Sequence, residues 1–357
     1  MKTTNHGYLS RLDHLRFFAI ALVLLTHFSG SLPTPKSIHS VMDFIDLWIK
    51  KGATGVSLFL VISGFIFCVI TDAGEKVIDY KKFITNRLFR IFPLLLVIFF
   101  IVITINRENS TPMDVLRVLT LQLNTGHSYT GWGREFFPSG PIWTIAVEFQ
   151  FYLIFPFLIK IMHQQGISKI FTMMICMFII RAFIVFDSDN GTYNNLYHSI
   201  TGRLDQFLWG MLFGYFYIKN KHTKFNNVQS FLLILTGVAI VTILMMAGDR
   251  SYFVRIFSFN LEALGWGFIL LGYMKSNIHI NKQVDSFFAY LGGLSYSLYL
   301  THLPVGFILI NKLDKYSFMH NGIATTLLII FPSCIFISWI TYSGIEKPFL
   351  MMRKKYL

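Results

Sequence analysis

The stretch IFPLLLVIFFIVITI at residues 91–105 decides the fold class of this chain, because it contains no ionisable side chain. It approaches the roughly 20 apolar residues that a helix needs to cross a bilayer. Comparable runs recur along the chain, in which 54% of the 357 residues are hydrophobic and only 14% are charged. A soluble protein would carry roughly 25% charged residues. The sequence therefore predicts an all-α, polytopic integral membrane protein, and it disfavours a soluble enzyme, a nucleic-acid reader and a disordered chain.

The apolar runs predict about ten transmembrane helices, because ten helices of about 20 residues would fill roughly 56% of the chain. The shorter, mixed segment at 113–123 is expected to lie at the membrane interface. An outer-membrane barrel is disfavoured, since its strands would alternate apolar and polar residues. The predicted helices lie near 15–32, 54–70, 91–106, 141–161, 168–186, 203–218, 229–247, 256–274, 286–310 and 322–342.

The basic charge of the chain is explained by membrane topology. The net charge is +13, from 31 Lys and Arg side chains against 18 Asp and Glu side chains. With the N-terminus in the cytoplasm, the cytoplasmic connections hold the larger share of the Lys and Arg, as the positive-inside rule requires. An even number of helices returns the C-terminus to the cytoplasm, in agreement with the basic residues 353–355. A nucleic-acid partner is therefore not expected.

The whole chain, residues 1–357, is expected to form a single transmembrane domain without a separate soluble domain. The apolar run at 17–25 follows basic residues, as in a signal peptide, but it lacks a small-residue cleavage site and is interpreted as the first membrane helix. The outer connection near 107–140 is expected to be a structured loop. No metal site or disulfide framework is expected, because the cysteines lie in apolar runs without ligand spacing. These are Cys68, Cys176 and Cys334.

Arg16 and His27 lie on the first predicted helix, separated by eleven positions. At about 100° per residue they share one helix face, about 16 Å apart along the axis. Arg16 is then expected at the cytoplasmic rim and His27 near the membrane midplane. One interpretation makes Arg16 an anion-binding group and His27 a general base. The alternative is a snorkelling arginine and a histidine that only hydrogen-bonds a neighbouring helix.

Glu148 is a second ionisable residue inside an apolar run, PIWTIAVEFQFY at residues 141–152. It is expected about 9 Å into its helix from the outer side. At that depth Glu148 could meet His27 and form a carboxylate–imidazole pair that raises the basicity of the histidine. Tyr152 lies one turn further along the same face. A purely structural hydrogen-bonding role for Glu148 is the alternative.

A polar stripe follows from the i, i+4, i+7 spacing of Ser295, Tyr299 and His302. Such a stripe on a membrane helix is expected to face protein or water rather than lipid. It could line a cavity for an acceptor substrate, and interhelical packing explains it equally well.

Arg87 and Arg90 precede Pro93, which is expected in the first turn of a membrane helix. Two cations at a helix N-terminus oppose the helix dipole and favour a nearby anion. That anion could be a lipid headgroup, a protein carboxylate or a bound phosphate. Lipid contact and topology alone are the alternative.

An ordered series of segments resembles the motifs of one family. They are RLDHLR at 11–16 with His27, GVSLFLVISGF at 55–65, RLFRIFP at 87–93, WTIAVEFQFY at 143–152, RLDQFLWG at 203–210, LSYSLYLTH at 294–302 and IEKPF at 345–349. Together they resemble the acyltransferase 3 family of integral-membrane acyltransferases, in its stand-alone form. The chain departs from the family pattern where Ser57 replaces an Asp, Phe149 replaces a Glu and His14 stands where Gly is common.

The resemblance implies transfer of an acyl group, usually acetyl, from cytoplasmic acyl-CoA to a hydroxyl of a cell-envelope or exported glycan. O-antigen, another surface polysaccharide or a lipid-linked glycan would be the acceptor, and the location would be the inner membrane. Acetyl-CoA would be a co-substrate, and no tightly bound cofactor is expected. Membrane lipids would surround the protein, whose oligomeric state is left open.

The resemblance also implies roles for the residues singled out above. His27 is expected to be the general base or a transient acyl carrier, with Glu148 as its catalytic partner. Coenzyme A is expected to bind Arg16, Arg87 and Arg90. The candidates for substrate binding are Asp13, Tyr152, Ser295, Tyr299 and His302.

Two other functions are the alternatives. One is a proton-coupled transporter that uses His27, Glu148 and His302 as an intramembrane relay. The other is a non-catalytic partner in envelope assembly.

Overall fold

The computed structural model describes residues 8–30, 32–105, 107–124, 142–187, 196–248, 252–313 and 322–357, and its regular elements in these ranges are all helical. Of the loop expected near 107–140, residues 125–140 lie outside the described residues. The longer helices are α1 (Ser10–Phe28), α3 (Gly55–Ile70), α4 (Tyr80–Ile105), α6 (Trp143–Gln165), α7 (Ile167–Asp187), α9 (Ile200–Lys219), α10 (Asn227–Ala247), α11 (Tyr252–Lys275) and α13 (Ser295–Leu313).

The remaining helices are shorter or interrupted. They are α2 (Val41–Lys50), α5 (Pro112–Leu119), α12 (Lys282–Gly293), α14 (Ile323–Thr325), α15 (Phe331–Thr341) and α16 (Lys347–Met351). Two π-helical turns, Thr326–Ile330 and Tyr342–Glu346, join α14, α15 and α16 into one continuous helical run. The segment predicted to lie at the interface forms α5, which begins at a capping box made by Thr111 and Asp114.

Helices occur at every position where a membrane helix was predicted. Within the described ranges, seven of them are long and apolar enough to cross a membrane, and the pair α12 and α13, bent by 62°, would add an eighth. Helices α1 and α9 are not in this set, and they carry the buried charged residues Asp13, Arg203 and Asp205. The protein is thus a multi-pass, all-helical membrane protein, whereas the count of ten spans and the cytoplasmic termini stay predictions.

The start of α4 corrects one expectation. The helix begins at Tyr80, so Arg87 and Arg90 lie inside it, and Pro93 is in its interior rather than in its first turn. Asp79 caps this earlier start, because its side chain accepts a hydrogen bond from the backbone N–H of Lys82 at 3.1 Å. The first turns of α4 are polar and were therefore not counted in the predicted membrane helix. The apolar run shows where α4 becomes apolar, and not where the helix begins.

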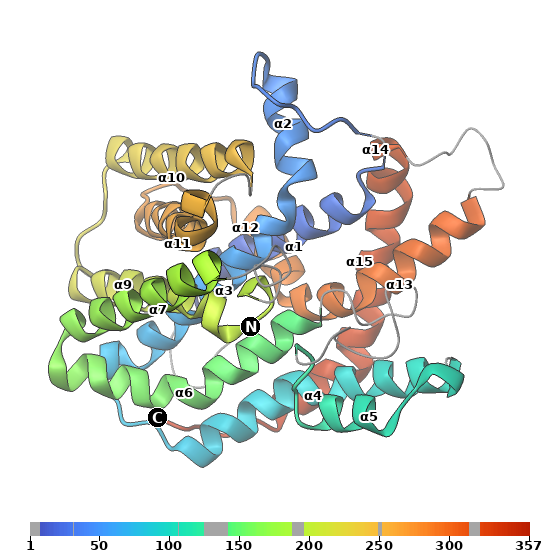
Figure 1. The fold of residues 1–357 in the computed structure, drawn as a ribbon, viewed down its shortest axis with the longest axis horizontal. Helices are drawn as coiled ribbons and strands as arrows, with labels where there is room; N and C mark the ends of the chain where they lie inside the picture. The colour runs from blue at the N-terminus through green and yellow to red at the C-terminus, as the bar shows by residue number, and fades with distance from the viewer. Residues whose placement is uncertain are drawn as a thin grey trace.

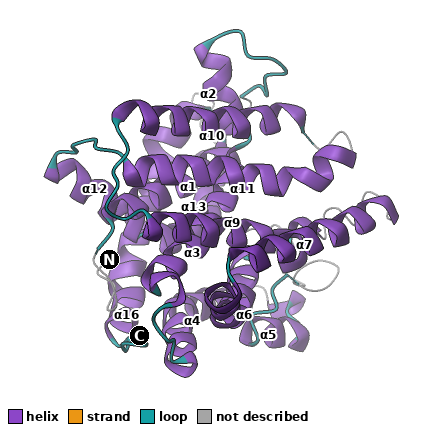
Figure 2. Cartoon of the chain, turned by 90° about the vertical axis from the view of Figure 1, so that its left-hand side faces the viewer, coloured by secondary structure: helices purple, strands orange, loops and turns teal. Residues whose placement is uncertain are grey.

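Helices α1 and α3 occupy the middle of the bundle. The α10–α11 pair lies toward one edge, and α4, α5 and α6 lie toward the opposite one (Figure 1, Figure 2). Helices α3 and α9 pack with their backbones in close approach, since a Cβ atom at Gly64 would meet the backbone oxygen of Phe207. Small residues commonly allow such close helix packing in membranes. The two ends of the described chain lie on the same side of the molecule (Figure 2).

Two buried polar networks hold α9 to its neighbours. In the first, the Asp205 carboxylate accepts hydrogen bonds from Arg181 of α7 at 2.5 Å and from Asn260 of α11 at 2.6 Å. In the second, Arg203 lies 3.8 Å from the Glu262 carboxylate of α11. Because unpaired charges are costly in an apolar interior, these partners make the charged residues of α9 compatible with its buried position.

Candidate active site

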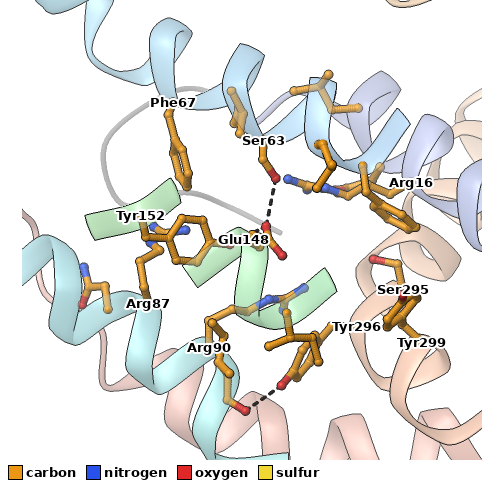
Figure 3. A pocket seen from close by; sticks show the side chains of 18 of the residues that line it. Arg16, Ser63, Phe67, Arg87, Arg90, Glu148, Tyr152, Ser295, Tyr296 and Tyr299 are labelled. Atoms are coloured by element: carbon orange, nitrogen blue, oxygen red, sulfur yellow. Dashed lines mark hydrogen bonds and ion pairs between the residues drawn. The ribbon is translucent and has the colours of Figure 1, made fainter. Parts of the chain in front are cut away.

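A cavity opens between α1, α3, α4, α6 and α13, and it offers about 180 Å³ to water-sized molecules. All the site residues proposed from the sequence line it, apart from the two histidines (Figure 3). Its polar and charged lining comes from distant parts of the chain, namely Tyr8, Asp13, Arg16, Ser63, Asn86, Arg87, Arg90, Thr144, Glu148, Tyr152, Ser295, Tyr296, Tyr299, Arg353 and Tyr356.

Glu148 lies in the wall of this cavity, on α6. Its carboxylate accepts a hydrogen bond from Ser63 Oγ of α3 at 2.9 Å and another from the hydroxyl of Tyr152 (Figure 3). The expected pair between Glu148 and His27 is not formed among the described residues. The expectation rested on depth along each helix, and depth does not fix the lateral position of a side chain. Glu148 faces α3 across the cavity, whereas His27 lies in the last turn of α1 beside α13.

His27 instead packs against His302 of α13, with ring centroids 5.3 Å apart. The imidazole of His302 is fully buried, and its Nδ1 lies 2.8 Å from the backbone oxygen of Tyr299 and 3.2 Å from that of Leu298. Carbonyl oxygens only accept hydrogen bonds, so Nδ1 carries the proton and Nε2 keeps a free lone pair. This Nε2 atom is buried and has no hydrogen-bond partner among the described residues. The buried Nε2 lone pair of His302 therefore lies beside the exposed imidazole of His27.

Tyr299 connects the two histidines to the cavity. Its ring lies 5.9 Å from that of His302, and its hydroxyl shares a 2.8 Å hydrogen bond with Thr144 of α6. Both Tyr299 and Thr144 line the cavity, whereas the histidines lie beyond them. The polar stripe of α13 therefore runs from Ser295 in the cavity wall to His302 beside α1.

The arginines of the cavity differ in their counter-charges. Arg16 donates to the carboxylate of Asp13 at 2.7 Å, and Arg90 is paired with the buried Glu346. Arg87 has no carboxylate within ion-pair distance among the described residues. Its guanidinium instead lies over the aromatic rings of Phe67, at 5.0 Å, and Phe83, at 5.3 Å. A protein carboxylate was one of the anions expected near Arg87 and Arg90. Among the described residues, such a carboxylate is present only for Arg90.

Arg353 is a cavity residue that the sequence analysis did not select. It follows α16, and the basic run to which it belongs was interpreted as a sign of topology. Burial, together with the nearby Arg87 and Arg90, lowers the pKa of Arg353 to about 10. Tyr8, at the other end of the chain, also lines the cavity, and burial beside Asp13 raises the pKa of its hydroxyl.

An acyltransferase domain family, acyltransferase 3, matches residues 9–343. The chain belongs to this family. The resemblance carried by the motifs is thereby confirmed, and the comparisons give no support to the transporter alternative. No solved structure is significantly similar to the chain.

Curated relatives of this acyltransferase include O-acetyltransferases of Staphylococcus aureus. O-acetyltransferase OatA of strain NCTC 8325 / PS 47 is 24% identical over 324 residues, which cover 84% of this chain and 50% of the relative. Putative O-acetyltransferase SACOL0978 of strain COL is 23% identical over 325 residues, with the same coverage of 84% and 50%. The chain spans about half the length of these relatives.

The structure explains how this acyltransferase accommodates Ser57 at a position where the family usually has Asp. Glu262 of α11 accepts hydrogen bonds from Ser57 Oγ, at 2.7 Å, and from Thr54. The same carboxylate lies 3.8 Å from Arg203. The carboxylate of Glu262, from α11, therefore lies beside Ser57, at the position where the family usually has the carboxylate of an Asp. Glu262 lies within a predicted membrane helix, so the rule that selected Glu148, an ionisable residue in an apolar segment, would have found it as well.

Proposed function

We propose that the protein is a membrane O-acetyltransferase that moves an acetyl group from cytoplasmic acyl-CoA to a hydroxyl of a cell-envelope or exported glycan. Family membership and the O-acetyltransferase relatives support the reaction class. The observation that carries the assignment is the cavity itself. Cations gather in its lining, and Tyr299 joins it to an imidazole pair.

The donor binds where the arginines gather. An acyl-CoA carries several phosphate groups, which guanidinium groups bind through charge-assisted, often bidentate hydrogen bonds. Arg87 is best placed for this, because no carboxylate neutralises it among the described residues. Arg16 and Arg90 add positive potential, although each already has a carboxylate partner. Tyr8 and Arg353 line the same cavity, so both ends of the described chain lie near the proposed donor site. Because the proposed donor is cytoplasmic, we place both termini in the cytoplasm and the protein in the inner membrane.

His27 acts as the general base. Its imidazole takes the proton of the acceptor hydroxyl, and the oxygen attacks the thioester carbonyl to give a tetrahedral intermediate. Collapse of the intermediate breaks the carbon–sulfur bond, and the departing thiolate takes the proton back from His27. The products are the acetyl ester and free coenzyme A. His302 positions the base, because its Nε2 lone pair can accept a hydrogen bond from the protonated imidazole of His27.

Glu148 contributes from the cavity wall rather than through His27. Its carboxylate accepts hydrogen bonds from Ser63 and Tyr152, so these three side chains form one polar surface in the cavity wall. We place the pantetheine arm of the donor along this surface. The acceptor sugar reaches the exposed face of His27 from the opposite side.

The test uses the purified protein in lipid vesicles with radiolabelled acetyl-CoA and isolated envelope glycans. We expect acetyl incorporation by the wild type, and a loss of about 10²–10⁴-fold in His27→Ala. His222→Ala, which changes an exposed histidine in a loop, serves as the matched control. Full activity of His27→Ala, or no transfer by the wild type, would overturn the proposal. Analysis of envelope glycans with and without the protein would identify the acceptor through one missing ester.

A further inference from the structure

The tail after α16, residues 352–357, is fixed against the first turns of α4. The side chain of Asn86 donates to the backbone oxygen of Lys354 at 2.6 Å and accepts from its N–H at 3.0 Å. The backbone N–H of Asp79 donates to the oxygen of Tyr356 at 2.9 Å. Tyr356 is buried, and its ring packs edge-on against Phe83 with centroids 5.3 Å apart. The tail is therefore a fixed wall of the cavity.

This wall brings a further cation to the arginines. Arg353 lines the cavity together with Arg87 and Arg90, and its Nε donates to the backbone oxygen of Leu350 at 3.1 Å. No carboxylate lies within ion-pair distance of Arg353 in the part of the chain that the structure describes. Tyr356 also contributes its ring to Arg87, whose guanidinium carbon lies 5.9 Å from the ring centroid. The tail thus supplies both a charge and an aromatic surface.

Two guanidinium groups without carboxylate partners, Arg87 and Arg353, face one cavity. Holding two like charges at a partly desolvated surface is unfavourable unless an anion neutralises both. Arg90 cannot relieve this arrangement, because it is itself a cation and Glu346 is already bound to it. A group with about two negative charges, such as a phosphate ester or a diphosphate, fits this requirement.

We propose that the tail at residues 352–357 is part of the donor site and that Arg353 and Arg87 together bind a phosphate group of the acyl-CoA. The inference rests on the proposed function, since it takes acyl-CoA as the donor. It adds a binding residue that lies after both the family match at residues 9–343 and the IEKPF segment at 345–349. Asn86 is then a positioning residue, because it holds the tail in place.

The test measures binding of coenzyme A to the purified full-length protein in detergent by calorimetry. We expect Arg353→Ala to weaken binding by about tenfold or more, and Asn86→Ala to weaken it by a smaller factor. Lys355→Ala, two residues further along the same tail and exposed, is the matched control and should bind as the wild type does. Acetyl-pantetheine, which lacks the nucleotide phosphates, should not distinguish Arg353→Ala from the wild type.

If Arg353→Ala and Lys355→Ala both bind coenzyme A as the wild type does, the role of the tail is wrong and the proposed function stands. If the wild type itself binds no coenzyme A, the proposed function fails.

Discussion

The protein holds two groups of charged side chains, which differ in how their charges are neutralised. Around α9, Arg181 is paired with Asp205, and Arg203 lies near Glu262. Around the cavity, Arg87 and Arg353 have no carboxylate partner among the described residues. The first group joins helices, and the second lines the cavity in which we propose that the donor binds. A missing carboxylate partner is what distinguishes the second group from the first.

The largest effect is expected in the paired group. Asp205→Asn would leave Arg181 buried and without its carboxylate, and loss of one partner of a buried ion pair costs about 3–5 kcal/mol. The variant should unfold at a much lower temperature in detergent and be recovered in lower yield. Glu75→Gln, which neutralises an exposed carboxylate, is the control. If Asp205→Asn is as stable as the wild type, the ion pair between Arg181 and Asp205 does not stabilise the fold, and the proposed difference between the two groups is wrong.

A smaller and different effect is expected in the cavity. Arg87→Gln removes a charge without a carboxylate partner, so the fold should be kept while the KM for acetyl-CoA rises about 10–100-fold. The measurement compares KM and kcat with those of Lys82→Gln, an exposed lysine on the same helix. An unchanged KM, or a loss of stability as large as in Asp205→Asn, would show that Arg87 has a structural role.

The smallest effect is expected at the border between the two groups. Ser57→Asp restores the usual family residue but places a second carboxylate beside Glu262. Arg203, whose guanidinium lies 3.3 Å from Ser57 Oγ, offsets only part of the repulsion, so the change should cost about 2 kcal/mol. Thermal unfolding should show a lower midpoint for Ser57→Asp and recovery in the double variant with Glu262→Gln. If the double variant recovers nothing, Glu262 does not substitute for the missing aspartate.

The sequence was sufficient for the helices and for eight residues of the cavity lining, namely Asp13, Arg16, Arg87, Arg90, Glu148, Tyr152, Ser295 and Tyr299. In lipid every backbone polar group must be satisfied within the chain, so long apolar runs become helices with little dependence on context. Periodicity along a helix also placed Glu148 and Tyr152 on one face, and they are joined by a hydrogen bond. Helix formation and the contact between Glu148 and Tyr152 both depend on residues close together in the sequence, and a sequence pattern can therefore predict them.

Such patterns do not predict which helices lie side by side in the membrane. His27 and Glu148 were assigned similar depths, yet α1 presents His27 to α13 and α6 presents Glu148 to α3. The bend between α12 and α13 was missed as well, because the apolar run continues through Leu294. Arg353 reaches the cavity because its tail is held against Asp79, Phe83 and Asn86, and no local pattern records a contact between such distant segments.

The contact between Asn86 and Lys354 joins residues 268 positions apart in the chain. During translation, α4 enters the membrane long before residues 352–357 leave the ribosome. The mouth of the cavity therefore stays incomplete through most of the synthesis of the protein. A nascent chain cannot assemble this wall until the helices between the two segments have been inserted, so the donor site that we propose there would form late, as a property of the finished bundle.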